Sequence, residues 1–117
     1  MGYQQAARLD DLPVGGAVRV EVDGTPVALV RVDQATVKAV HDVCSHQHYP
    51  LSDGEVDLDD GTIECAKHGS TFDLDRGDPQ SLPATAPVPV YACRVGDDGT
   101  VEVDLDAPLN DAEEPAH

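Results

Sequence analysis

Apolar and polar residues alternate along much of the chain, and this alternation predicts a protein built from short strands. Residues 18–22 place valines at every second position between charged residues, which is typical of a strand with one buried face. Asp23-Gly24 then predicts a hairpin turn into a more continuously apolar strand at 27–32. The same patterns predict further strands at 3–8, 37–41, 56–58, 62–64, 71–74, 90–95 and 100–105. No stretch carries a convincing helical stripe, so the predicted class is all-β.

The composition limits how such strands can be held together. The 117 residues suffice for one domain with a modest core, and a bound metal centre would help to stabilise so small a body. With one Phe, three Tyr and no Trp, that core must consist mainly of Val, Leu and Ala. Residues 106–117 are acidic and lack periodicity, which predicts a disordered tail.

The charge balance is strongly acidic, with 7 Lys and Arg against 23 Asp and Glu and a formal net charge of -16. This charge argues against binding to nucleic acids or anionic membranes, because both reward positive charge. It favours a basic protein partner, whose approach would be accelerated by the electric field and slowed by salt. The alternative is that the charge serves solubility alone.

The sequence also gives expectations for the cellular location of the protein and for the roles of its cysteines. The longest apolar runs, such as Val27–Val30, are too short to span a bilayer, and no secretion signal opens the chain, so we expect a cytoplasmic protein. The 3 cysteines are an odd number, and two of them are candidate metal ligands. Cys93 is therefore expected to be a small buried residue outside any disulfide. His41, at the end of a predicted strand, is expected to be structural.

The stretch from Cys44 to Phe72 carries the candidate chemistry. It contains two pairs of metal ligands, Cys44-x-His46 and Cys65-x-x-His68. Four such ligands could close one tetrahedral zinc site or be shared between the two irons of a cluster. Structural zinc sites usually keep about two to four residues between the members of a pair. The tight spacing is better suited to a [2Fe-2S] centre with mixed ligation, in which the members of each pair bind different irons.

These pairs and their surroundings resemble the cluster-binding loops of Rieske proteins. Cys44-Ser-His46 matches the first loop, and Cys65-Ala-Lys-His68-Gly69 followed by Phe72-Asp73 matches the second. The resemblance covers about residues 3–105. It implies a Rieske-like antiparallel β-sandwich or barrel, within a domain of residues 1–105, and a small cluster-binding subdomain at about residues 43–76.

The resemblance also implies how the cluster is held. Each chain would bind one [2Fe-2S] cluster, with Cys44 and Cys65 on one iron and His46 and His68 on the other. The proline-rich segment 83–89 looks like the third loop of the family, which covers the cluster.

Departures from the family pattern indicate which kind of Rieske protein this is. Respiratory and photosynthetic members carry an extra cysteine in each loop, and here those positions are Tyr49 and Lys67, so the disulfide of those members cannot form. Those members also have a tyrosine that donates to a ligand sulfur, where this chain has Phe72. Ser70 matches the serine that donates to a bridging sulfide. Because fewer donors to sulfur lower the potential, we expect a value toward the low end of the Rieske range of about -150 to +300 mV.

The function that the resemblance implies is that of a soluble, stand-alone ferredoxin similar to those of dioxygenase systems. Such a monomer would pass one electron at a time from a flavin- and NADH-dependent reductase to an oxygenase or another redox acceptor. No catalytic residue is expected, since no Ser-His-Asp arrangement, phosphate loop or dinucleotide fingerprint is present. Two alternatives remain: a non-redox β module that is regulatory or stabilised by zinc, and the detached Rieske domain of an oxygenase.

Overall fold

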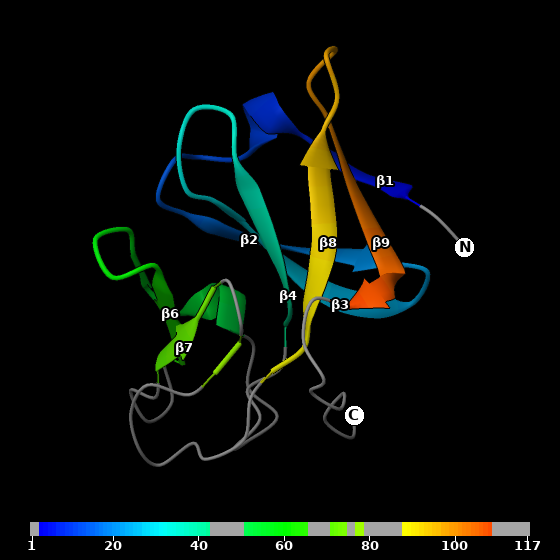
Figure 1. The fold of residues 1–117 in the computed structure, drawn as a ribbon. Helices are drawn as coiled ribbons and strands as arrows, with labels where there is room; N and C mark the ends of the chain where they lie inside the picture. Colours follow the sequence, from blue (N-terminus) through cyan, green and yellow to red (C-terminus); the bar gives the residue numbers. More distant parts are fainter. Residues whose placement is uncertain (1–2, 43–50, 66–70, 75–76, 79–87, 109–117) are drawn as a thin grey trace.

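The computed structural model describes residues 3–42, 51–65, 71–74, 77–78 and 88–108, which form two antiparallel sheets (Figure 1). The larger sheet has six strands in the order β1-β9-β8-β4-β3-β2. Its strands are β1 (Gln4–Arg8), β2 (Ala17–Val22), β3 (Thr25–Arg31), β4 (Val37–His41), β8 (Val90–Val95) and β9 (Thr100–Pro108). The smaller sheet consists of β5 (Val56–Asp57), β6 (Thr62–Glu64) and β7 (Thr71–Asp73). Two short 3-10 turns, η1 (Leu9–Asp11) and η2 (Leu51–Asp53), complete the described elements, and no helix in these ranges could cross a membrane.

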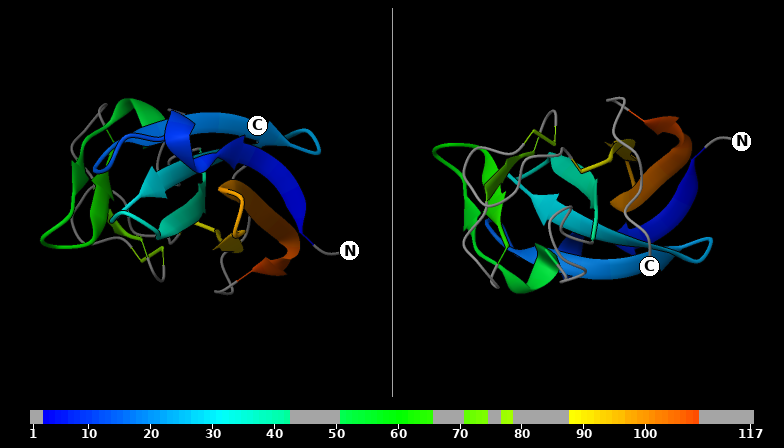
Figure 2. Two further views of the ribbon diagram at one scale, coloured as in Figure 1. Left: turned by 90° about the horizontal axis from the view of Figure 1, so that it is seen from above. Right: turned by 90° about the horizontal axis from the view of Figure 1, so that it is seen from below.

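The six-stranded sheet curls into a nearly closed barrel, as the views from above and below show (Figure 2). Its edge strands are β1 and β2, and η1 lies on the connection between them. A parallel bridge between Val14 and Arg31 fastens this connection to the end of β3. The hairpin of β8 and β9 returns to β1. The predicted all-β class and the antiparallel barrel are confirmed.

The predicted turn at Asp23-Gly24 joins β2 to β3. Both residues have positive φ, 51° at Asp23 and 80° at Gly24. A two-residue turn with positive φ at both positions matches the twist of the flanking strands, and Asp-Gly adopts this conformation readily. The strands therefore pair from Val22 opposite Thr25 without a bulge.

β3 lies between two layers of core, because alternate residues of a strand point to opposite faces of its sheet. Val27 and Leu29 belong to the inner cluster, within the barrel, which comprises Leu12, Val22, Val27, Leu29, Val37, Ala39, Tyr91, Val101 and Val103. Ala28 and Val30 belong to the outer cluster, between the barrel and the smaller sheet, which comprises Ala28, Val30, Val40, Leu51, Ile63, Cys65, Phe72, Leu74, Val88 and Val90. Burial on both faces explains the continuous apolar run of β3.

The structure differs from the sequence predictions mainly at the ends of elements. β9 runs to Pro108, past the predicted end at residue 105, so the first residues of the predicted disordered tail are in a strand. The rest of that tail, residues 109–117, lies outside the described residues. β5 ends at Asp57, and Leu58, predicted to be in the strand, is 43% exposed. The 3-10 turns were not predicted because a single turn is too short to show a periodic stripe.

Candidate metal centre

Only part of the predicted ligand set lies within the described residues. Cys65 follows β6 directly, and Phe72 is the central residue of β7. The other predicted site residues lie outside the described ranges: Cys44, His46, Tyr49, Lys67, His68 and Ser70. The structure therefore describes the strands that lead into the two ligand pairs, β4 for the first and β6 for the second.

Cys65 is buried in the outer cluster, with 1% of its surface exposed. Ile63, two residues earlier on β6, pairs with Phe72 on β7, and both side chains are fully buried in the same cluster. A thiolate in such apolar surroundings needs a positive charge beside it, because burial alone favours the neutral thiol. The position of Cys65 therefore fits a metal–sulfur centre that is screened from water.

The end of β4 is anchored to two neighbouring segments before the chain reaches the first ligand pair. The N–H of His41 donates to the carbonyl of Pro89 at 2.8 Å, and that of Asp42 donates to the carbonyl of Pro26 at 3.0 Å. His41 is fully buried, and its Nδ1 lies 3.1 Å from the hydroxyl of Tyr91, which is hydrogen-bond distance. The structural role predicted for His41 agrees with this packing.

Asp42 places a fully buried carboxylate directly before residues 43–50, which contain the first predicted ligand pair and are called the first ligand loop below. Its Oδ1 accepts a hydrogen bond from the N–H of Ser52 at 2.6 Å, and its Oδ2 accepts one from the Ser52 hydroxyl at 2.7 Å. A guanidinium nitrogen of Arg19, on β2, lies 3.3 Å from the same Oδ2. One carboxylate therefore connects the residue before the first ligand loop to the 3-10 turn after it.

η2 extends this connection toward Cys65. Leu51, the first residue of η2, is fully buried in the outer cluster, and its carbonyl accepts a hydrogen bond from the N–H of Gly54 at 2.9 Å. Gly54 lies so close to the backbone of Glu64 that a Cβ atom at this position would overlap the Glu64 carbonyl oxygen. The N–H of Glu64 donates to the carbonyl of Glu55 at 2.8 Å. The residues that flank the two predicted ligand pairs are thus joined in one packed unit.

The segment predicted to cover the cluster, residues 83–89, is described only at Val88 and Pro89. Val88 is fully buried in the outer cluster, and its N–H donates to the carbonyl of Gly77 at 2.9 Å. Pro89 accepts the hydrogen bond from His41. The end of this segment is therefore fixed against β4 and against the chain that follows β7.

The family model for the Rieske [2Fe-2S] domain matches residues 2–92, a range that includes both predicted ligand pairs and the whole smaller sheet. This chain belongs to the Rieske family. A [2Fe-2S] cluster is the cofactor of a Rieske domain, and the ligand types of the two pairs are the cysteine and histidine that such a cluster takes.

Ferredoxins are among the relatives of this Rieske domain. The anthranilate 1,2-dioxygenase ferredoxin subunit of Burkholderia cepacia is 42% identical over 80 residues, which cover 68% of this chain and 70% of that protein. The ferredoxin of carbazole 1,9a-dioxygenase from Nocardioides aromaticivorans IC177 is 33% identical, with a TM-score of 0.83 over 92% of this chain and 99% of that chain. A chain from a complex of reduced oxygenase and oxidized ferredoxin in carbazole 1,9a-dioxygenase is 31% identical, with a TM-score of 0.77 over 98% of this chain and 96% of that chain.

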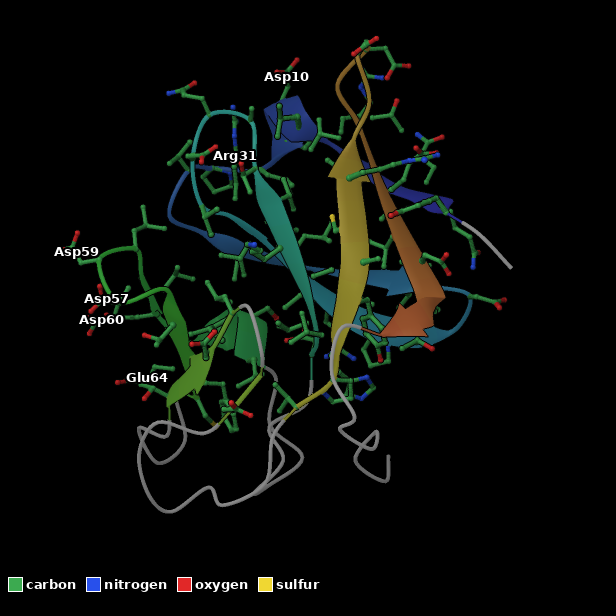
Figure 3. The ribbon with its side chains drawn as sticks, in the orientation of Figure 1. Asp10, Arg31, Asp57, Asp59, Asp60 and Glu64 are labelled. Carbon is green, nitrogen blue, oxygen red and sulfur yellow. The ribbon has the colours of Figure 1, made fainter. Side chains whose placement is uncertain are left out.

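The smaller sheet of the Rieske domain also carries an acidic groove of about 670 Å³, whose lining carboxylates are those of Glu55, Asp57, Asp59, Asp60 and Glu64. Figure 3 labels four of these residues, Asp57, Asp59, Asp60 and Glu64. The Oδ1 atom of Asp57 accepts hydrogen bonds from the N–H groups of Asp59 and Asp60 at 3.0 and 3.2 Å. This Asp-rich stretch is therefore a turn. Within the described ranges, no three His, Cys, Asp or Glu side chains are arranged to hold a metal ion.

Cys93, on β8, packs against the inner cluster and is not in a disulfide, but it is half-buried and not fully buried as predicted. Burial raises the pKa of its thiol to about 12, and the positive charge of Lys38 offsets this effect only in part. The thiol is therefore neutral at physiological pH, which agrees with the predicted role of a small packing residue and not with that of a ligand.

Sequence reasoning missed the role of Asp42, Ser52 and Gly54 in connecting the ligand loops of the Rieske domain. The composition of residues 52–55 predicts only a turn, and Asp42 follows the predicted strand at 37–41 without a predicted role of its own. One signal was present: Asp42 is an acidic residue directly after an apolar strand and two positions before Cys44. Its pairing with Ser52 could not be predicted, because periodicity gives no information on contacts across a loop.

Proposed function

We propose that this Rieske protein is a ferredoxin that carries one electron at a time from a reductase to an oxygenase. The observation that carries this proposal is the extent of the likeness to ferredoxins. The match covers 92% of this chain and 99% of the Nocardioides ferredoxin chain, at 33% identity and a TM-score of 0.83. The proposed functional unit is one Rieske domain, residues 1–105, with its cluster-binding subdomain at about 43–76.

In the proposed site, Cys44 and Cys65 bind one iron and His46 and His68 bind the other, with one cluster per chain. Two thiolates and two neutral imidazoles leave an oxidised [2Fe-2S] centre formally about neutral, so an added electron costs less than in a four-thiolate centre. The buried position of Cys65 at the end of β6 keeps its sulfur away from water. The outer cluster holds that sulfur in one place during each electron transfer.

The surroundings of the site favour a low potential for a Rieske protein. Phe72 is fully buried opposite Ile63, and its ring offers no hydrogen bond to a ligand sulfur. Ser70 would supply one donor to a sulfide, while Tyr49 and Lys67 occupy the positions of the missing disulfide. We expect a midpoint toward the low end of the range of about -150 to +300 mV. Protein-film voltammetry measures this value, and a midpoint above about +150 mV would contradict the expectation.

The proposed partners are a flavin- and NADH-dependent reductase and an oxygenase. The oxygenase is supported by the matched chain from a complex between an oxygenase and a ferredoxin. The net charge of -16 supports partners with basic docking surfaces. The ferredoxin itself would act as a monomer, which sedimentation of the purified protein would test.

The central experiment is analysis of the metal content and redox chemistry of the purified protein. We expect about two irons and two acid-labile sulfides per chain, and an EPR signal that appears only after reduction. When the reduced protein is mixed with the oxygenase component of a dioxygenase system, it should pass its electron to that component and become oxidised again. Zinc without sulfide would instead indicate a non-redox β module stabilised by zinc.

A further inference from the structure

We propose that Asp42 is a positioning residue for the [2Fe-2S] cluster, which closes the base of the first ligand loop and connects it to the strand that carries Cys65. This inference rests on the proposed function, because it assumes that the two ligand pairs hold a cluster. Asp42 itself is not proposed as a ligand, since both of its carboxylate oxygens are occupied by other contacts.

The geometry of the carboxylate is the first support. Asp42 and Ser52 flank the first ligand loop, and the two hydrogen bonds between them, at 2.6 and 2.7 Å, are short and charge-assisted. They join the two ends of the segment that contains Cys44 and His46. A loop whose ends are joined has fewer conformations available, so its ligands are closer to the geometry that the cluster needs.

The cost of burying this charge is the second support. Asp42 is fully buried, and the Arg19 side chain that faces it is 43% exposed at a separation of 3.3 Å. Burying a carboxylate costs free energy, and well-packed apolar residues often serve stability as well or better. We therefore infer that the buried carboxylate of Asp42 serves mainly to hold its hydrogen-bond partners in fixed orientations, and not to raise the free energy of unfolding.

The third support is the continuity from this contact to Cys65. Ser52 belongs to η2, whose first residue, Leu51, packs in the outer cluster with Cys65. Gly54 follows η2 and lies against the backbone of Glu64, the residue before Cys65. A shift of Ser52 away from Asp42 would therefore also move the support of the second ligand pair. In this way Asp42 fixes the two ligand pairs relative to each other.

The charge of Asp42 should also affect the midpoint potential of the cluster, which a purely structural contact in the loop would not do. Asp42 is two residues before Cys44, so their Cα atoms are at most about 7 Å apart, although this is not the distance from the carboxylate to the cluster. A buried negative charge in this position is poorly screened and opposes the addition of an electron. Arg19 partly neutralises it. Removing the charge of Asp42 should raise the midpoint potential, and removing the charge of Arg19 should lower it.

The test uses single variants of the full chain, loaded with the cluster. Asp42→Asn keeps the shape and one oxygen acceptor for Ser52, so we expect the cluster to be retained with a higher midpoint potential. Asp42→Ala removes every contact, and we expect chelator-driven loss of the visible absorption of the cluster to be about tenfold faster or more. Ser52→Ala keeps the backbone hydrogen bond and should fall between wild type and Asp42→Ala. Arg19→Gln should shift the potential in the direction opposite to Asp42→Asn.

The matched control is Glu21→Gln, because Glu21 is an exposed carboxylate on β2, two residues from Arg19. Exposed charges are screened by water and salt, so its potential and its rate of cluster loss should equal those of wild type. EPR spectra of the reduced proteins report the ligand geometry, and circular dichroism reports the fold. If Asp42→Ala does not fold, Asp42→Asn, Ser52→Ala and Arg19→Gln still decide between the outcomes.

The positioning role is overturned if Ser52→Ala and the folded Asp42 variants lose the cluster at the wild-type rate with wild-type EPR spectra. It is also overturned if Asp42→Asn and Arg19→Gln leave the potential unchanged or shift it in the same direction. If the variants give either of these results but the wild-type protein still holds a [2Fe-2S] cluster, only the role of Asp42 is overturned. The proposed ferredoxin function then stands. A wild-type protein that holds zinc without sulfide overturns both proposals.

Discussion

Arg31, at the end of β3, holds together two turns that are distant in sequence (Figure 3). Its guanidinium donates hydrogen bonds to the carbonyls of Leu9 and Leu12 at 3.2 and 3.0 Å, around η1. It also donates to the carbonyls of Asp33 and Gln34 at 3.3 and 2.8 Å, in the turn between β3 and β4. One side chain thus fixes the connection between β1 and β2, the two edges of the barrel.

Replacing Arg31 with Met should destabilise the fold, because four carbonyls would lose a charged donor while the aliphatic part of the side chain remains. We expect a loss of about 2–3 kcal/mol, which lowers the Tm of a domain this size by about 8–12 °C. The control is Arg94→Met. Arg94 is 57% exposed, pairs with Glu102 at 2.9 Å and stacks over Tyr3, so its loss should cost only about 1 kcal/mol. Equal Tm values for the two variants, measured by circular dichroism, would contradict the role of Arg31.

Cys93 should resist alkylation in the folded protein. The raised pKa of about 12 means that very little thiolate is present at pH 8, and only the thiolate reacts. Because the ordinary thiol pKa is 9.0, the reaction with iodoacetamide should be roughly a thousandfold slower than for an exposed thiol, and faster as the pH rises toward 12. Mass spectrometry of the intact protein measures the rate, with urea-unfolded protein as the control. Rapid labelling of Cys93 at pH 8 while the fold is retained would contradict the burial.

At the scale of elements, the absence of a side chain at Gly54 allows η2 to lie close to β6. A Cβ atom there would overlap the carbonyl oxygen of Glu64, and a backbone oxygen cannot turn away as a side chain can. Gly54→Ala should therefore separate η2 from β6 and cost about 1–3 kcal/mol or more. Gly96→Ala is the control, since its nearest neighbour is an oxygen of the exposed Asp98 side chain at 3.2 Å, which can move away into solvent. Thermal unfolding measures both variants, and an undisturbed Gly54→Ala protein would show that the two elements can separate freely.

Strand positions could be predicted because the information is local. β4, β6 and β8 begin and end where the alternation of apolar residues predicts, and Asp23-Gly24 specifies its own turn. The apolar run at 27–32 predicts a strand that is buried on more of its surface than the strand at 18–22, and each face of β3 does lie against its own cluster. Apolar periodicity contains this information because burial is decided residue by residue along a strand.

The parts that could not be predicted depend on contacts between distant segments. The hydrogen bonds of Asp42 to Ser52, and the approach of Gly54 to Glu64, require knowledge of how η2 lies against the sheets. The support for the ligand residues is of a different kind. These residues are Cys44, His46, Cys65 and His68. Their residue types and spacing predicted the family, which the match to residues 2–92 confirms, but their roles as ligands stay a prediction.

At the scale of the whole molecule, the acidic residues create a field that acts on every charged species that approaches. Of these residues, Asp57, Asp59 and Asp60 form the edge of the groove on the smaller sheet, whereas Asp10 lies on η1 (Figure 3). The acidic surface therefore extends over more than one face of the barrel. A net charge of -16 should accelerate encounters with a basic protein and slow encounters with an anion.

Salt should therefore change two electron-transfer rates in opposite directions. Raising the ionic strength from about 10 mM to 150 mM shortens the screening length from about 30 Å to 8 Å. The second-order rate constant for reduction by a basic reductase should fall by about tenfold or more, because screening removes the attraction. Reduction by dithionite, an anion, should become faster because screening removes a repulsion. Stopped-flow absorbance at the cluster band measures both rates on the same protein. If both rates fell together, salt would be acting on the ferredoxin itself, and the net charge would serve solubility and not encounter.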